Sequence, residues 1–319
     1  MSIDRVATST QTAFMLSQIQ NAGAALDKTQ EQIASGKNAT TYAGFGNQAQ
    51  VLTASISASA RNDAYTNATK FAVTQTDLQD TQLTSLSSLA ASLKKAVSDA
   101  VANNDATTLM TQAQSIFDQA SAILNSKDAN GDYIYSGGKT DVPPVTVNSL
   151  SALQALPSVS AAFANGNLAK SVEVADGVNV SYGLTASGVA TGLMQALQDV
   201  GQFDAGPSGN FNSATSLTPA QSTFLTNAIA QTTTVATNIN ATSAANGYVS
   251  NRLTDAQSQQ ASMTTLFSQF ISNIQDTNMA DAATQLSLNQ TQLQAALQVT
   301  AGLNKLSLLN YLPISGAGG

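Results

Sequence analysis

The stretch "VSNRLTDAQSQQASMTTLFSQFISNI", residues 249–274, decides the fold of this chain. One set of positions, here called its seam, recurs in alternating steps of four and three residues. These positions are Val249, Leu253, Ala256, Gln260, Met263, Phe267, Phe270 and Ile274. This heptad spacing places one side of an α-helix against a partner helix. The sequence therefore predicts a long helix here with a second long helix beside it.

The N-terminal region carries a similar seam. Its positions step by 4, 3, 4, 3 and 4 residues, and they are Met15, Ile19, Ala22, Leu26, Thr29 and Ile33. The tripeptide Ser35-Gly36-Lys37 is expected to end this helix, because glycine breaks the helical pattern. A second helix is predicted for residues 48–101, before the Asn-Asn-Asp break at 103–105. A third has Leu109, Ala113, Ile116, Ala120 and Ile123 on one face.

Residues 128–217 have a different composition, rich in proline and glycine. Valines alternate with polar residues in "SVEVADGVNVSY", which predicts a β-hairpin around the turn Asp176-Gly177. Short helices are expected at 149–163 and 189–200. We therefore interpret this part as a small insert between helical segments.

The helical pattern resumes after the insert. Thr218 can cap the next helix, Pro219 suits its first position and Gln221 completes a capping box. The pair Asn246-Gly247 is expected to interrupt this helix. A last helix should begin near Asn278.

These patterns predict a mainly α fold. It is a long antiparallel helical hairpin, or coiled-coil bundle, formed by the N- and C-terminal segments, with a small β-containing inserted domain. The expected division has five segments. They are an N-terminal coiled-coil assembly segment at 1–44, the first part of a helical core domain at 45–127, the insert at 128–217, the second part of the core domain at 218–276, and a C-terminal coiled-coil assembly segment at 277–319.

Composition excludes several kinds of function. The net charge is −7 with only 12 basic residues, and no basic cluster is available to bind nucleic acid. Cysteine and histidine are both absent, so ordinary zinc sites and Ser-His or Cys-His dyads cannot form. No apolar run is long enough to insert into a membrane. We expect no enzyme activity, no catalytic residues, no cofactor and no metal.

Two local motifs resemble known sites but do not match them. Gly138-Lys139-Thr140 resembles the end of a P-loop, but Tyr133 occupies the position of its first glycine. Asp128, Asn130 and Asp132 are spaced like the start of a calcium loop. That loop requires a glycine where Tyr133 stands and a carboxylate where Lys139 stands. Both motifs are therefore interpreted as turns.

The C-terminal stretch "LQAALQVTAGLNKLSLLNYLP", residues 293–313, has leucines over more than half of a helical circumference. One partner helix cannot cover so wide an apolar surface, so contact between subunits is the favoured interpretation. For residues 15–33 and 249–274, pairing within one chain and pairing between chains stay open. The predicted subunit interface consists of Met15, Ile19, Leu26, Ile33, Leu293, Leu297, Leu303, Leu306 and Leu309.

Three stretches resemble the bacterial flagellin superfamily, which includes filament flagellins and hook-filament junction proteins. "LDKTQEQIASGKNATT" at 26–41 is similar to the family's N-terminal helix and its glycine turn. "NMADAATQLSLNQTQLQAALQVTAGLNKLSLLNYL" at 278–312 resembles its C-terminal segment. "NGDYIYSGGKTDVPPV" at 130–145 resembles the junction proteins more than the filament flagellins. The family's Asp-Asp pair after the glycine turn is absent here.

The resemblance implies a structural subunit of the bacterial flagellum that joins hook to filament by self-assembly through its terminal helices. The implied partners are its own copies in a ring or helical tube, a neighbouring hook-associated protein, flagellin and a flagellar export chaperone. The implied location is extracellular, after export without a cleaved signal peptide. A filament flagellin is the alternative, and a secreted helical adhesin or pore-former is a third hypothesis.

Overall fold

The computed structural model describes residues 3–213 and 216–309, with the side chains of 3–9, 213 and 303–309 left out. The chain divides into two compact units. One joins residues 1–60 to 264–319, and the other comprises residues 61–263. The first unit joins two segments that are far apart in the sequence, as expected for a helical hairpin, whereas the second is one continuous stretch that contains the insert.

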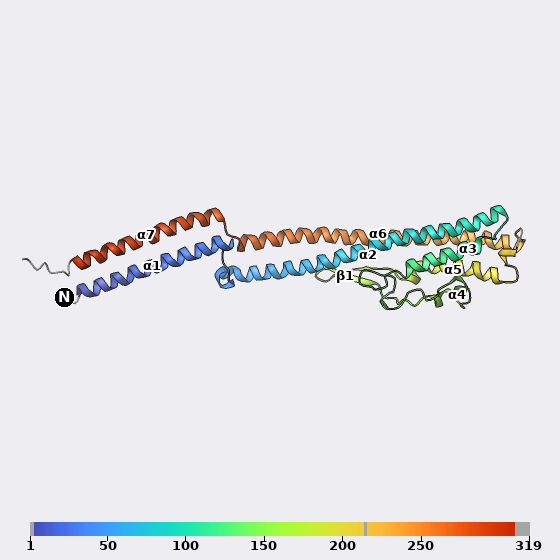
Figure 1. Ribbon diagram of the computed structural model, residues 1–319, viewed down its shortest axis with the longest axis horizontal. Coiled ribbons are helices and arrows are strands. Elements are labelled where there is room, and N and C mark those ends of the chain that lie inside the picture. The colour runs from blue at the N-terminus through green and yellow to red at the C-terminus, as the bar shows by residue number, and fades with distance from the viewer. Residues whose placement is uncertain (1–2, 214–215, 310–319) are drawn as a thin grey trace, which may run out of the picture. The chain divides into compact units, whose positions relative to one another are not determined.

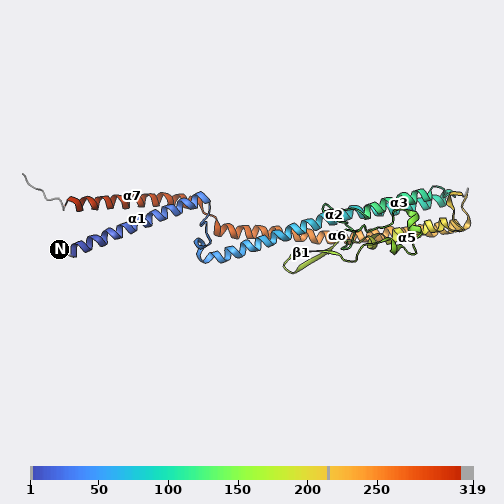
Figure 2. The same cartoon turned by 60° about the horizontal axis from the view of Figure 1, so that its bottom comes forward.

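The first unit contains the helices α1, Ile3–Ser35, and α7, Met279–Leu309. They lie side by side in two views (Figures 1 and 2). The pairing is antiparallel, because Thr300 of α7 contacts Met15 while Asn289 contacts Ala25. The 3-10 helix η1, Tyr42–Gln48, completes the unit with the first turns of α2, Ala49–Asn103, and the last turns of α6, Pro219–Gln275. The predicted pairing of terminal helices is confirmed.

In the second unit α2 and α6 pair along a seam that is polar in one part and apolar in another. The shorter helices α3, Leu109–Leu124, and α5, Ala186–Ala205, pack on one part of this pair and share its core (Figure 1). The connecting segments contribute α4, Leu150–Gln154, and the 3-10 helices η2, Val159–Ala162, and η3, Phe211–Ser213. The mainly α fold class is confirmed.

The insert contains the predicted hairpin. Strand β1, Lys170–Ala175, pairs with β2, Val178–Tyr182, in an antiparallel sheet of two strands. Gly177 in the turn has φ +72°, a left-handed conformation that glycine adopts without strain. Val172, Val174, Val180 and Tyr182 are buried against residues of α2 and α6, including Ala72 and Leu253. The hairpin therefore closes part of the α2–α6 seam.

Two further predictions about helix boundaries can be judged. The capping box before α6 is confirmed, since the Thr218 hydroxyl accepts from the Gln221 N–H at 3.2 Å and the Gln221 side-chain carbonyl accepts from the Thr218 N–H at 2.8 Å. The expected interruption at Asn246-Gly247 is wrong, because α6 continues to Gln275. Asn246 is buried, and its amide donates to the Thr76 carbonyl of α2 at 2.8 Å. Pairing with α2 therefore outweighs the low helix propensity of Asn-Gly.

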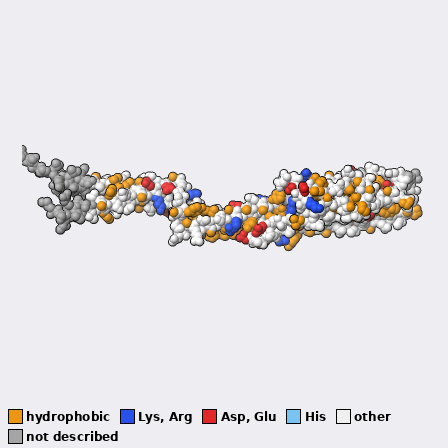
Figure 3. All heavy atoms as spheres, turned by 90° about the horizontal axis from the view of Figure 1, so that it is seen from below, with side chains coloured by type: hydrophobic (Ala, Val, Ile, Leu, Met, Phe, Trp, Pro, Cys, Tyr) orange, Lys and Arg blue, Asp and Glu red, His pale blue; other side chains and the backbone are white. Residues whose placement is uncertain are grey.

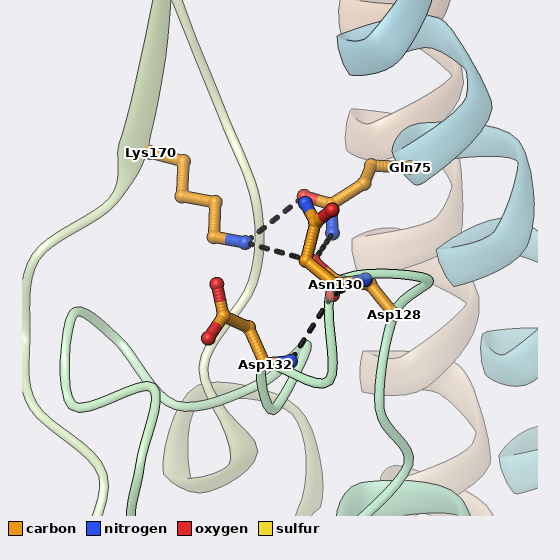
Figure 4. A network of polar contacts seen from close by, with 5 residues as sticks. All are labelled: Gln75, Asp128, Asn130, Asp132 and Lys170. Atoms are coloured by element: carbon orange, nitrogen blue, oxygen red, sulfur yellow. Dashed lines mark hydrogen bonds and ion pairs between the residues drawn. The ribbon is translucent and has the colours of Figure 1, made fainter.

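A polar network fastens the insert to α2 (Figure 4). The Asp128 carboxylate accepts from the Asn130 and Asp132 N–H groups at 2.9 and 3.1 Å, and from the Gln75 side chain at 3.2 Å. The Lys170 ammonium lies 3.8 Å from the same carboxylate and donates to the side-chain oxygen of Gln75 at 3.2 Å. These donors already surround the carboxylate, whose side chain is only 6% exposed. The loop that resembles a calcium site is thus a turn closed by a lysine.

Gln260 of α6 links three parts of the second unit. Its side-chain amide donates to the Thr69 hydroxyl at 3.0 Å and to the Val174 carbonyl of β1 at 2.8 Å. The Asn62 amide of α2 donates to the Gln260 backbone carbonyl at 2.9 Å. Gln260 is buried, so these bonds are shielded from water.

We predict that Gln260→Ala lowers the free energy of unfolding by about 2 kcal/mol, because it leaves the buried Val174 carbonyl without this donor. Chemical denaturation followed by circular dichroism measures the change. Gln259→Ala is the matched control, since Gln259 is exposed on the same helix and its loss should change stability by less than about 0.5 kcal/mol. Equal effects of the two variants would contradict this role of Gln260.

Candidate assembly surface

The seam between α1 and α7 is formed by a heptad pattern on each helix. On α7 the positions turned away from solvent again step by 4, 3, 4, 3 and 4 residues, and they are Ala282, Leu286, Asn289, Leu293, Ala296 and Thr300. They face the predicted seam of α1, and most residues on both sides are only half-buried. Two helices alone therefore leave this seam partly open to water.

The predicted interface residues fall into three groups. Met15, Ile19, Leu26, Ile33 and Leu293 are half-buried on the seam between α1 and α7 of one chain. Leu297 is 49% exposed beside the seam. Leu303, Leu306 and Leu309 belong to α7, but their side chains lie outside the described part of the chain. Burial of these nine residues between subunits stays a prediction.

Exposed apolar side chains flank the seam on both sides of α7. Leu288 and Leu297 are each 49% exposed and stand nine residues apart, about two and a half turns, so they project from opposite sides of the helix. Val299 shares the side of Leu288, since 11 residues are about three turns. Phe14 and Leu16 on α1 are also exposed. Figure 3 shows hydrophobic side chains at the surface of this helix pair, next to the grey atoms.

One polar layer interrupts the apolar seam. The Asn289 side-chain amide donates to the Thr29 hydroxyl at 2.9 Å and to the Ala25 carbonyl at 3.1 Å. Both Asn289 and Thr29 are buried. A shift of one helix by a heptad would remove the Thr29 hydroxyl from the Asn289 amide, because Ala22 and Gly36 stand seven residues before and after Thr29 and carry no side-chain acceptor. This layer therefore favours a single register, as a buried asparagine does in other coiled coils.

Sequence reasoning placed Thr29 on the seam but overlooked Asn289. The signal was available, because Asn289 lies three residues after Leu286 and four before Leu293, at a heptad position. The surrounding glutamines and serines make an asparagine inconspicuous in this chain.

Among the residues that the structure describes, no three acidic, histidine or cysteine side chains are grouped so as to hold a metal. Within residues 3–213 and 216–309, no helix combines the length and the apolar content needed to cross a membrane. The distinctive property of α1 and α7 is their partly covered apolar surface.

We predict that Asn289→Leu makes the helix pair more stable but less specific in register. A leucine at this buried position contributes about 1–2 kcal/mol of apolar burial and removes the bond to Thr29. Because the chain has no cysteine, pairs can be introduced cleanly. Met15→Cys with Thr300→Cys reports the observed register, in which these side chains are in contact. Ala22→Cys with Thr300→Cys reports a register shifted by one heptad.

Disulfide formation by both pairs should be compared with and without Asn289→Leu. The shifted pair should gain yield only with the leucine, while Gln290→Leu, an exposed control, should leave the yields unchanged. A single register in the leucine variant would show that the polar layer does not determine the pairing.

Comparison with known proteins identifies related sequences and a related fold. Residues 229–312, which contain α7 and all of α6 except its first ten residues, match the family model "Bacterial flagellin C-terminal helical region". "Flagellar hook-associated protein 3" of Salmonella typhimurium is 29% identical over 147 residues, covering 44% of this chain and 45% of the relative. The matched region thus spans less than half of that relative's length.

A solved structure from Vibrio parahaemolyticus, assigned as a flagellar hook-associated protein, has a similar fold. The TM-score is 0.56 at 19% sequence identity, over 72% of this chain and 97% of the other. At this identity the likeness concerns the fold alone. The two sequence matches make this chain similar to bacterial flagellins in its C-terminal region and to a flagellar hook-associated protein over 147 residues.

Proposed function

We propose that this protein is a structural subunit of the bacterial flagellum that joins hook to filament by self-assembly through α1 and α7. The observation that carries the proposal is the apolar surface on both sides of α7, within the region that matches the flagellin C-terminal family. Exposed apolar side chains stand on both sides of α7 and on α1, and neighbouring subunits would cover them.

The energetics favour ordering by neighbours. A helix pair whose seam is only half-buried gains less from its own packing, and the stability of a helix in a protein comes mostly from packing of its apolar side. Each leucine that passes from half-exposed to buried contributes about 1 kcal/mol. Contacts on two sides of α7 would therefore stabilise the subunit and hold it between its neighbours.

The junction role is supported by the name of the curated relative, a hook-associated protein. The filament role remains the alternative, because the matched C-terminal family is named after flagellin itself. In either role the partners we propose are copies of this chain in a ring or helical tube, a neighbouring hook-associated protein, flagellin and an export chaperone. The proposed location is the flagellum outside the cell, without a cleaved signal peptide, and the proposed role is not enzymatic.

We predict that Leu297→Asp abolishes assembly and leaves the helix content of the free subunit within about 5% of the parent, because Leu297 is exposed beside the seam. Burial of an unpaired carboxylate between subunits costs several kcal/mol, enough to prevent association. Sedimentation measures assembly and circular dichroism measures helix content.

The matched control is Gln298→Asp, which adds the same charge at the next, exposed position and on a different side of the helix. It should assemble like the parent. Leu293→Asp provides a contrast, because it places the charge on the α1–α7 seam and should reduce helix content. Normal assembly of Leu297→Asp would refute the proposed use of this surface.

Deletion of the gene separates the two flagellar roles. Hooks without filaments, with flagellin released into the medium, would indicate the junction role. Loss of both filament and secreted flagellin would indicate the filament role. Normally flagellated cells would contradict both, and binding of the purified protein to liposomes would favour the third hypothesis, a secreted pore-former.

A further inference from the structure

The loop after α1 and the linker before α7 meet at one residue, Asn38. Its backbone N–H donates to the Gln275 carbonyl at 2.7 Å, and its side-chain amide donates to the carbonyls of Ile274 and Asp276 at 2.9 and 3.0 Å. Its side-chain oxygen accepts from the Thr277 hydroxyl at 2.9 Å. All the polar groups of this side chain thus face a segment more than 230 residues away in sequence.

These bonds satisfy groups that a helix end cannot satisfy by itself. The last carbonyls of an α-helix have no N–H partner in the helix, and those near the end of α6 are at residues 274–276. Asn38 supplies donors to three of them from another part of the chain. The Asn38 carbonyl in turn accepts from the Gln32 side chain of α1 at 2.9 Å, which fixes the loop on its own helix.

A second set of bonds joins the same two breaks. The Thr277 N–H donates to the Gly36 carbonyl at 2.9 Å, and the backbones of Lys37 and Asp276 pair as an isolated antiparallel β-bridge. The linker between α6 and α7 is short, and Asn278 already caps α7, because its side-chain oxygen accepts from the Ala280 N–H at 3.1 Å. The breaks at 36–41 and 276–278 therefore share their hydrogen bonds.

We propose that Asn38 couples these two breaks into a single hinge at the closed end of the α1–α7 pair. When the Asn38 side chain releases the α6 carbonyls, the loop after α1 and the linker before α7 open together. Asn38 acts as a positioning residue, since it sets where α1 and α7 leave the rest of their unit. The hinge is a property of the free subunit and does not depend on the proposed flagellar role.

The simpler alternative is that each break is held by its own turn. Gly36 has φ +69°, which suits the residue after a helix, and its N–H donates to the Gln32 carbonyl at 2.9 Å. In that case removal of the Asn38 side chain would loosen only the loop in which it lies. The two cases differ in whether removal of the Asn38 side chain also loosens the linker at 276–278.

Asn38→Asp tests the coupling with almost no change in shape. The carboxylate cannot donate to the Ile274 and Asp276 carbonyls, and its charge is repelled by them. Asn47→Asp is the matched control, because Asn47 is exposed in η1 and receives the same charge. Asn38→Ala is the second variant, which removes the side-chain bonds without adding charge.

Native-state hydrogen exchange by NMR reports on the amides of Gly36 and Thr277, one in each break. In both variants at Asn38, the amide hydrogens of Gly36 and Thr277 should exchange at least about tenfold faster than in the parent, and by similar factors. In the control, both amides should exchange at the rates of the parent. The proposal is overturned if Gly36 alone is affected, or if neither amide responds in the alanine variant. If only the aspartate variant unfolds, the exchange rates of the two amides in the alanine variant decide between the two cases.

Discussion

The structure depends on antiparallel pairing of long helices that carry heptad seams. An amphipathic helix is marginal in isolation, and its apolar side contributes only when another surface covers it. Here α1 requires α7 and α2 requires α6, so the two helices of each pair come from segments that are far apart in the sequence. The turns and the insert are arranged around this requirement.

The two pairs differ in how completely their seams are covered. Along α2, positions seven residues apart change from polar to apolar, and they are Asn62, Thr69, Thr76, Leu83, Ala90 and Val97. The apolar part belongs to the core shared with α3 and α5, whereas Ala72, within the polar part, packs against the hairpin. The α1–α7 pair has no such cover in the described chain, and its flanking leucines remain exposed. This difference is the reason why we propose an assembly role for α1 and α7.

Much of the fold followed from periodicity and turn chemistry. Heptad steps predicted the long helices, and alternation around Asp176-Gly177 predicted the hairpin, because both patterns report burial on one side of an element. The error at Asn246-Gly247 arose because local propensity was weighed without the partner helix, where Asn246 finds an acceptor. Pro157 likewise separates α4 from η2, where one helix was expected over 149–163.

The residues that position the candidate surface were harder to predict. Asn38 and Asn289 act through bonds to segments far away in sequence, and no spacing rule reveals such partners. Leucine patterns identified apolar positions but could not separate those facing α1 from those facing outward. Leu293 is half-buried on the seam, whereas Leu297, four residues later, is 49% exposed. That distinction required the observed register of α1 and α7.

The central claim is that α1 and α7 pair within one subunit while neighbouring subunits cover the outer sides of α7. Oxidative footprinting of leucine side chains in the free and assembled protein tests it most directly. The account predicts that Leu288 and Leu297 both become protected on assembly, while Leu293 changes little. Strong protection of Leu293 alone would contradict the account, because it would mean that the seam itself forms between subunits.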